Sequence, residues 1–142
     1  MRTARSAVRR VSRRDDGADV SGRREPAVLL ALDVLAVVLF AAAGRRSHAE
    51  GLSAAGVLAT AWPFGAGTVA GWGVARAWRR PTSPTTGLVV WVAAVVLGML
   101  LRRLTGDGTA WPFVVVATVV LAALLLGWRA AVRVVRSREP RG

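Results

Sequence analysis

The chain has 142 residues, of which 54% are hydrophobic, and yet its net charge is +12. Soluble domains rarely combine such apolarity with such charge. Here long apolar blocks alternate with short arginine-rich blocks, a pattern typical of membrane spans and their loops. The absence of Cys excludes disulfides and Cys-ligated metals, and the single His, His48, excludes a multi-histidine metal site within one chain. We expect no metal and no cofactor.

Residues 1–26 hold eight Arg and four acidic residues, with few large apolar side chains and no periodicity. This composition predicts a disordered basic tail in the cytoplasm.

The apolar blocks predict an all-α integral membrane protein with a four-helix membrane domain over residues 27–131. A basic cytoplasmic tail is expected over residues 132–142. Eighteen apolar residues in the first block reach about 27 Å, just enough for the hydrocarbon core. A signal peptide is the alternative for this block, but Asp33 interrupts it and further spans follow. The four predicted spans cover residues 27–44, 57–78, 85–101 and 109–130.

The second apolar block is longer than a simple span and contains Trp62-Pro63. Pro favours the first turn of a helix and Trp favours the membrane interface. Residues 52–61 therefore form either an interfacial helix or the outer turns of a bent one, and both remain open. At the other end of the chain, the sequence after Trp128 can continue the fourth helix along the membrane surface.

The basic residues, all of which are Arg, predict the orientation. With the N-terminus inside, 16 of the 20 arginines fall on the cytoplasmic side and 4 outside. We therefore expect a multi-pass protein of the cell membrane with both termini in the cytoplasm. The Arg, Ala, Val and Gly bias suggests a bacterial source of high GC content. The basic loops would meet anionic lipid head groups, and no nucleic-acid partner is expected.

The pentapeptide TAWPF occurs twice, at Thr60–Phe64 and at Thr109–Phe113. Each copy follows an Arg-Arg pair and leads to a Gly-Trp pair, at Gly71-Trp72 and Gly127-Trp128. The spacings differ between copies. We interpret the pattern as two duplicated helical hairpins related by an axis along the membrane normal. The alternative is that Trp-Pro is simply good chemistry for a helix start at the interface.

Asp33 lies inside the first span, where an unpaired carboxylate costs about 2.5–3.5 kcal/mol on insertion scales. It should therefore face the bundle, be neutral, or pair with a cation, and Arg76 and Arg129 lie at similar depths. One hypothesis is a proton or cation site. The favoured interpretation is a structural Asp–Arg pair that holds helices together.

A second candidate site is on the outer side, where the arginines oppose the positive-inside trend. It is an anion site formed by Arg45, Arg46, His48, Arg102 and Arg103. The simpler explanation is that Arg at a helix C-terminus complements the helix dipole and reaches the head groups.

In the second span, Gly67 and Gly71 form a small-residue face that predicts close helix packing or dimerisation. The six Trp residues, most of them near predicted span ends, are interpreted as interfacial anchors. His48 and Glu50 resemble the start of a zinc deaminase signature, which also needs a Cys pair that is absent. No P-loop or nucleophile elbow occurs, so we predict that the chain is not an enzyme.

The segment from LDVLAVVLFAAAGRRSHAEG to GTAWPFVVVATVVLAALLLGWR, roughly residues 28–131, resembles the domain of unknown function 3054 family. The resemblance depends on Asp33, on Gly44–His48, on the Trp-Pro-Phe segments and on Gly127–Arg129. It implies a small multi-span membrane protein of bacteria and archaea and carries over no catalytic roles.

Three functions follow as hypotheses. The favoured one is a non-enzymatic helical bundle that acts as a structural or accessory subunit, with a homodimer or a membrane protein as partner. The alternative is a small oligomeric transporter or channel that uses Asp33 and the outer arginines. The third is a membrane enzyme acting on a lipid phosphate, with His48, Glu50, Asp107 or Asp33 as its base.

Overall fold

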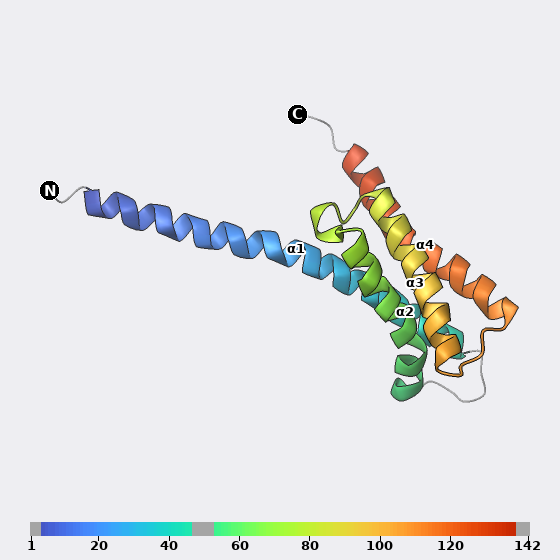
Figure 1. Ribbon diagram of the computed structural model, residues 1–142. Coiled ribbons are helices and arrows are strands. Elements are labelled where there is room, and N and C mark those ends of the chain that lie inside the picture. Colours follow the sequence, from blue (N-terminus) through green and yellow to red (C-terminus); the bar gives the residue numbers. More distant parts are fainter. Residues whose placement is uncertain (1–3, 47–52, 139–142) are drawn as a thin grey trace.

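The computed structural model describes residues 4–46 and 53–138, with side chains described from Glu25 onward. This part of the chain is all-helical, as predicted (Figure 1). Its elements are α1 (Ala4–Arg46), α2 (Ala54–Val74), the short 3-10 helix η1 (Ala77–Arg79), α3 (Pro84–Leu104) and α4 (Trp111–Arg138).

Three helical segments are long and apolar enough to cross a membrane: Glu25–Arg46 in α1, Pro84–Leu104 in α3 and Trp111–Arg138 in α4. They confirm the prediction of membrane-spanning helices. The helix α2 is of similar length but is not among them, because its Gly, Thr, Trp and Pro residues dilute its Ala, Val and Leu.

Helices extend into both terminal segments of the chain. The segment predicted to be disordered, residues 1–26, is helical from Ala4 onward. This segment is rich in Arg and Ala, which are good helix formers, and contains no Pro before Pro26, which lies inside α1. The basic segment from residue 132 continues α4 as far as Arg138, as the sequence after Trp128 allows.

The helix α2 is continuous through Pro63, so residues 54–61 belong to the same helix as the rest of the second apolar block. It begins where the Ser53 hydroxyl accepts a hydrogen bond from the Gly56 N–H (3.1 Å). It ends before Arg76, whose φ of 47° turns the chain into η1 and the loop to α3.

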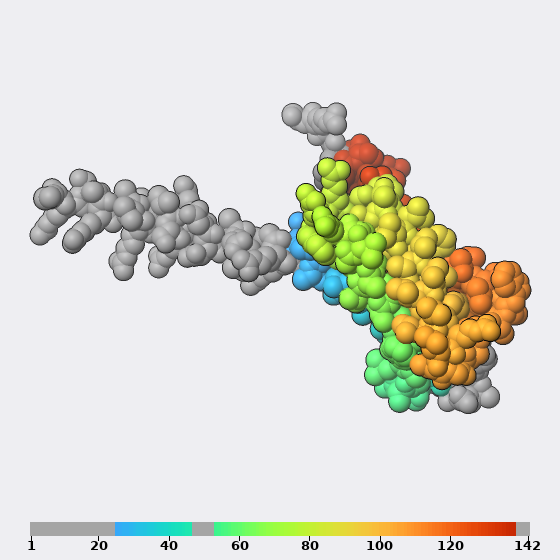
Figure 2. All heavy atoms as spheres, viewed as in Figure 1, coloured from blue at the N-terminus to red at the C-terminus, as the bar shows by residue number. Residues whose placement is uncertain are grey.

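The helices α2 and α3 lie side by side on the face shown in Figure 2 and approach each other closely. A Cβ built on Gly67 would lie 2.7 Å from the Ala93 carbonyl oxygen, and one built on Gly71 would lie 2.8 Å from the Val90 Cα. The predicted small-residue face is thus used for packing within the chain. A second copy cannot dock there, because α3 already covers it.

At one end of the bundle the three Phe residues of the chain come together. The rings of Phe40 in α1 and Phe64 in α2 meet edge to face, with centroids 5.3 Å apart. The ring of Phe113 in α4 lies 6.3 Å and 6.2 Å from them. Gly98 of α3 lies directly against the Phe64 ring. We call these three rings the Phe cluster.

At the other end, polar residues of the same helices meet. Asp33 of α1, Trp72 of α2 and Arg129 of α4 are in contact, and Gly87 of α3 lies against Arg129. Each helix therefore contributes to both ends. The order of the contacts along the chain shows that α1 and α3 run in one direction and that α2 and α4 run in the other.

Candidate functional site

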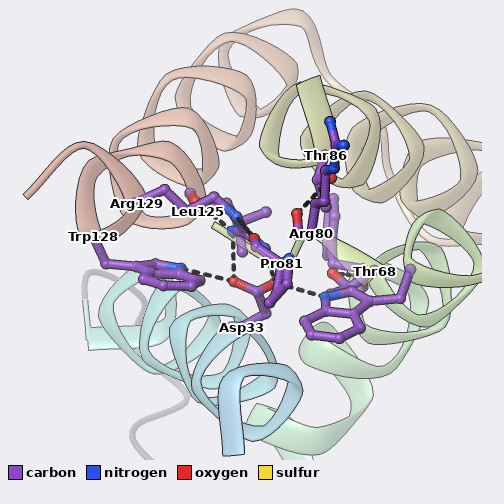
Figure 3. A network of polar contacts seen from close by, with 10 residues as sticks. Asp33, Thr68, Arg80, Pro81, Thr86, Leu125, Trp128 and Arg129 are labelled. Atoms are coloured by element: carbon purple, nitrogen blue, oxygen red, sulfur yellow. Dashed lines mark hydrogen bonds and ion pairs between the residues drawn. The ribbon is translucent and has the colours of Figure 1, made fainter. Parts of the chain in front are cut away.

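The carboxylate of Asp33 is fully buried, and each of its oxygens accepts two hydrogen bonds (Figure 3). Oδ1 accepts from Trp128 Nε1 (2.8 Å) and from Arg129 Nη1 (2.9 Å). Oδ2 accepts from Trp72 Nε1 (2.7 Å) and from Arg129 Nη2 (2.6 Å). We call these four residues the Asp33 cluster. It joins α1 to α2 and α4.

Arg129 is the cation of this cluster and is 2% exposed. Besides its two-pronged ion pair with Asp33, its Nη1 donates to the Leu125 carbonyl (2.6 Å) and its Nε donates to the Pro81 carbonyl (3.0 Å). Its guanidinium also lies 4.4 Å from the centre of the Trp128 ring, a cation–π distance. Arg129 thereby connects α4 to the loop that precedes α3.

That loop is itself held in place. The Thr86 hydroxyl donates to the Arg80 carbonyl (2.9 Å), and Ser83 caps the N-terminus of α3. Gly87 leaves room for the arginine, because a Cβ there would lie 2.8 Å from the Arg129 Cδ. All four helices and this loop therefore converge on one buried ion pair.

The electrostatics of the cluster are balanced. One negative and one positive group cancel, and a carboxylate has about four lone-pair sites, all of which are matched by a donor here. Burial of an ion pair carries a large desolvation cost, which is offset only when the geometry is good and the remaining polar atoms are bonded. The arrangement meets both conditions, so it can hold helices together but leaves no acceptor for a cation or a passing proton.

The structure selects between the two cations considered for Asp33. Arg129 pairs with it at 2.6 Å, whereas Arg76 is exposed in the turn after α2. Arg76 has a left-handed conformation, with φ of 47°, at the point where the chain passes from α2 into η1.

Of the five residues of the predicted outer anion site, the structure describes four. Arg45 lies against Gly56, and Arg46 and Arg103 are exposed. Arg102 is engaged locally: it lies 3.9 Å from Asp107, donates to the Gly108 carbonyl (3.3 Å) and lies 4.5 Å from the centre of the Phe113 ring. His48, the fifth residue, lies outside the described residues.

Two residues of the Asp33 cluster were not predicted as site residues. Trp72 and Trp128 turn their indole N–H groups inward to Asp33, and Trp91 likewise donates to the Thr118 carbonyl (3.0 Å). The interfacial-anchor interpretation is therefore wrong for the buried Trp72, and it stays a prediction for the half-buried Trp91 and Trp128. Trp62 and Trp111 are exposed, as that interpretation expects. The sequence feature that could have identified Trp72 and Trp128 as site residues is the Gly-Trp pair that follows each TAWPF segment.

The two copies of TAWPF have different surroundings. Pro63 lies in the interior of α2, whereas Pro112 is in the first turn of α4. Their Phe residues nevertheless meet in the Phe cluster, and the Trp residues of the two Gly-Trp pairs meet at Asp33.

Among the described residues, no group of three or more His, Asp or Glu side chains could hold a metal ion. The Asp33 cluster contains one acid, and both of its carboxylate oxygens already accept hydrogen bonds.

Comparison with known proteins bears on the family. Residues 30–132 match the family described as "Protein of unknown function (DUF3054)", over a segment that includes both the Asp33 cluster and the Phe cluster. No curated protein and no solved structure matches the chain.

Proposed function

Because the chain belongs to the family Protein of unknown function (DUF3054), which brings no activity with it, we propose a function from the chain's own geometry. The chain is a non-enzymatic helical bundle that spans the cell membrane four times and serves as a structural or accessory subunit.

One observation carries this proposal, namely the saturation of Asp33. An acid that transports a proton or cation needs a free lone pair and a route to water. Asp33 is 0% exposed, and four N–H donors occupy its oxygens. A fixed ion pair of this kind is suited to locking helices in one arrangement, on which a partner subunit can assemble.

The fourth span, α2, is supported by its length and direction. Its 21 residues extend about 31 Å at 1.5 Å per residue, enough for the hydrocarbon core. Because α1 and α3 run in the same direction, the chain must return across the bundle between them, and α2 is the segment that returns.

The proposed orientation has both termini in the cytoplasm. It is supported by a concentration of arginines at one end of the bundle, where Arg79, Arg80, Arg133 and Arg136 line a common pocket. Reporter fusions test it: those at Ser83 and at the C-terminus should report a cytoplasmic location, and those at Ala49 and Asp107 an outside one. The reverse result would overturn the orientation.

A duplicated hairpin is the origin we propose for the two TAWPF segments. The support is that corresponding residues of the two units contact the same residues of α1: Phe64 and Phe113 contact Phe40, and Trp72 and Trp128 bind Asp33.

The two alternatives have less support. A transporter that uses Asp33 would first have to break four hydrogen bonds, and Arg102 is already engaged by Asp107. A lipid-phosphate enzyme would need a base. Its first candidates, His48 and Glu50, lie outside the described residues.

The decisive experiment measures flux and assembly together. Purified protein in vesicles should move protons, cations and anions no faster than empty vesicles do. Asp33→Asn should lower thermal stability and the recovery of any cross-linked membrane partner. Flux through the wild type that a folded Asp33→Asn variant abolishes would overturn the proposal in favour of a transporter.

A further inference from the structure

A groove between α3 and α4 continues into an arginine-lined pocket at the end of the bundle near the Asp33 cluster. The groove has a volume of about 480 Å³ and is bordered by Pro84, Leu88, Leu126 and Ala130, with Arg129 buried at its base. It is mostly apolar and lies within the size range of ligand pockets, about 300–1,000 Å³.

The second pocket, also of about 480 Å³, is polar. Its lining includes four arginines and one acid: Arg79, Arg80, Arg133, Arg136 and Glu25. No ion pair joins these arginines to an acid within the described residues, and their guanidinium groups are exposed. The pocket therefore has a net positive charge, which favours an anion.

The two cavities share Thr82 and Arg133, so they are adjacent. Figure 2 shows the segment before α3 and the last turns of α4 at the same end of the molecule. The N-terminus of α3, which carries the positive end of the helix dipole, lies at their junction.

Their depths match the two parts of a lipid. The basic pocket is bordered by Glu25 and by the loop before Pro84, where two of the membrane-spanning segments begin, so it lies at the level of the head groups. The groove contains Leu88 and Leu126, which lie inside such segments, so it lies at the level of the acyl chains.

We infer that this composite cavity is a binding site for an anionic phospholipid. An acyl chain lies along Leu88 and Leu126 between α3 and α4, and the phosphate is held by Arg133 and Arg136, with Arg79 and Arg80 opposite. Basic pockets between membrane helices are a known means of recognising anionic head groups. This site goes beyond the proposed structural role and does not depend on it.

Lipid titration of the purified full-length protein, followed by native mass spectrometry, tests the inference. Phosphatidylglycerol should bind more tightly than phosphatidylcholine. In an Arg133→Gln, Arg136→Gln variant its affinity should fall about 30-fold, because each Arg near an anionic head group contributes appreciably. The matched control is Arg103→Gln, an exposed arginine at the other end of the bundle, which should leave the preference intact.

Two further arms separate the parts of the ligand. Ala130→Leu, which fills the groove, should weaken both lipids alike. A large excess of glycerol phosphate should fail to displace phosphatidylglycerol. Equal affinity of the wild type for the two lipids, an unchanged preference in the double variant, or displacement by glycerol phosphate would each overturn the inference. Since the first of these outcomes uses only the wild type, misfolding of a variant cannot conceal a failure.

Discussion

The two ends of the bundle are held by different forces acting on the same helix. At one end α1 presents Phe40 to two other aromatic rings, and at the other it presents Asp33 to four N–H donors. The two residues are seven positions apart, about two helical turns, so they lie on one face of α1.

The two ends differ in how much an incorrect neighbouring side chain would destabilise them. Lipid tails are as apolar as the Phe rings, so in a membrane the Phe cluster gains mainly from packing. A charge in the bilayer has no comparable alternative environment, and hence an incorrect neighbour for Asp33 is far more costly. The polar end should therefore determine which helices associate, and the aromatic end should adjust to them.

Removal of the cation should have the largest effect. Arg129→Met leaves Asp33 buried without its partner and should lower the free energy of unfolding by about 3–5 kcal/mol, measured by detergent or thermal unfolding in micelles. Arg138→Met, at an exposed position on the same helix and outside the proposed lipid site, is the matched control and should change little.

The double variant Asp33→Leu, Arg129→Met sharpens the interpretation. It removes both charges together and should recover most of the lost stability. If it remains as unstable as Arg129→Met, the hydrogen bonds to other groups, and not the unpaired charge, account for the loss.

Loss of an indole donor should have a smaller effect. Trp72→Phe keeps an aromatic side chain, with a smaller ring, and removes one hydrogen bond to a charged oxygen, a loss of about 1.5–3 kcal/mol in the same unfolding measurement. Trp62→Phe, whose side chain is 46% exposed, should be almost silent. Equal effects of the two substitutions would contradict the special role of the polar end.

The α2–α3 contact, which lies between the two ends of the bundle, should be sensitive to a single added methyl group. Gly67→Ala places a Cβ within 2.8 Å of the α3 backbone, so the two helices must separate, at a cost of about 1–3 kcal/mol. Gly65→Ala is the matched control, because nothing lies within 4 Å of its added Cβ. Thermal melting of the two variants in one detergent compares them directly, and a neutral Gly67→Ala would argue against the close α2–α3 packing.

The Phe cluster should respond least. Phe113→Leu keeps an apolar side chain but loses the aromatic geometry with Phe40 and Phe64, worth about 0.5–1.5 kcal/mol. The same unfolding assay measures it. A cost larger than that of Trp72→Phe would reverse the comparison between the two ends.

Much of the architecture was predictable. Runs of apolar residues indicate helices that cross a membrane because their composition alone decides whether they enter lipid. The family resemblance, now confirmed over residues 30–132, rests on the same segments. The sequence also predicts that Asp33 is either neutral or paired, since a lone carboxylate in the bilayer is too costly.

The helical ends were harder to predict. Charge and the lack of apolar periodicity suggested disorder before residue 27, yet α1 extends back to Ala4. Helix propensity without tertiary contacts is a weak signal in either direction, so composition alone does not determine where this helix begins.

The amino-acid sequence by itself determined that this is a helical membrane protein of its family. It also determined that Asp33, an acid within a membrane span, must be neutral or paired. Only the tertiary structure decided that Arg129 and not Arg76 neutralises it, that Trp72 and Trp128 complete the cluster, and that Gly67 faces α3 and not a second copy. The physical reason is separation along the chain. Asp33 lies 39 positions from Trp72 and 96 from Arg129, and such pairs meet only through the packing of whole helices.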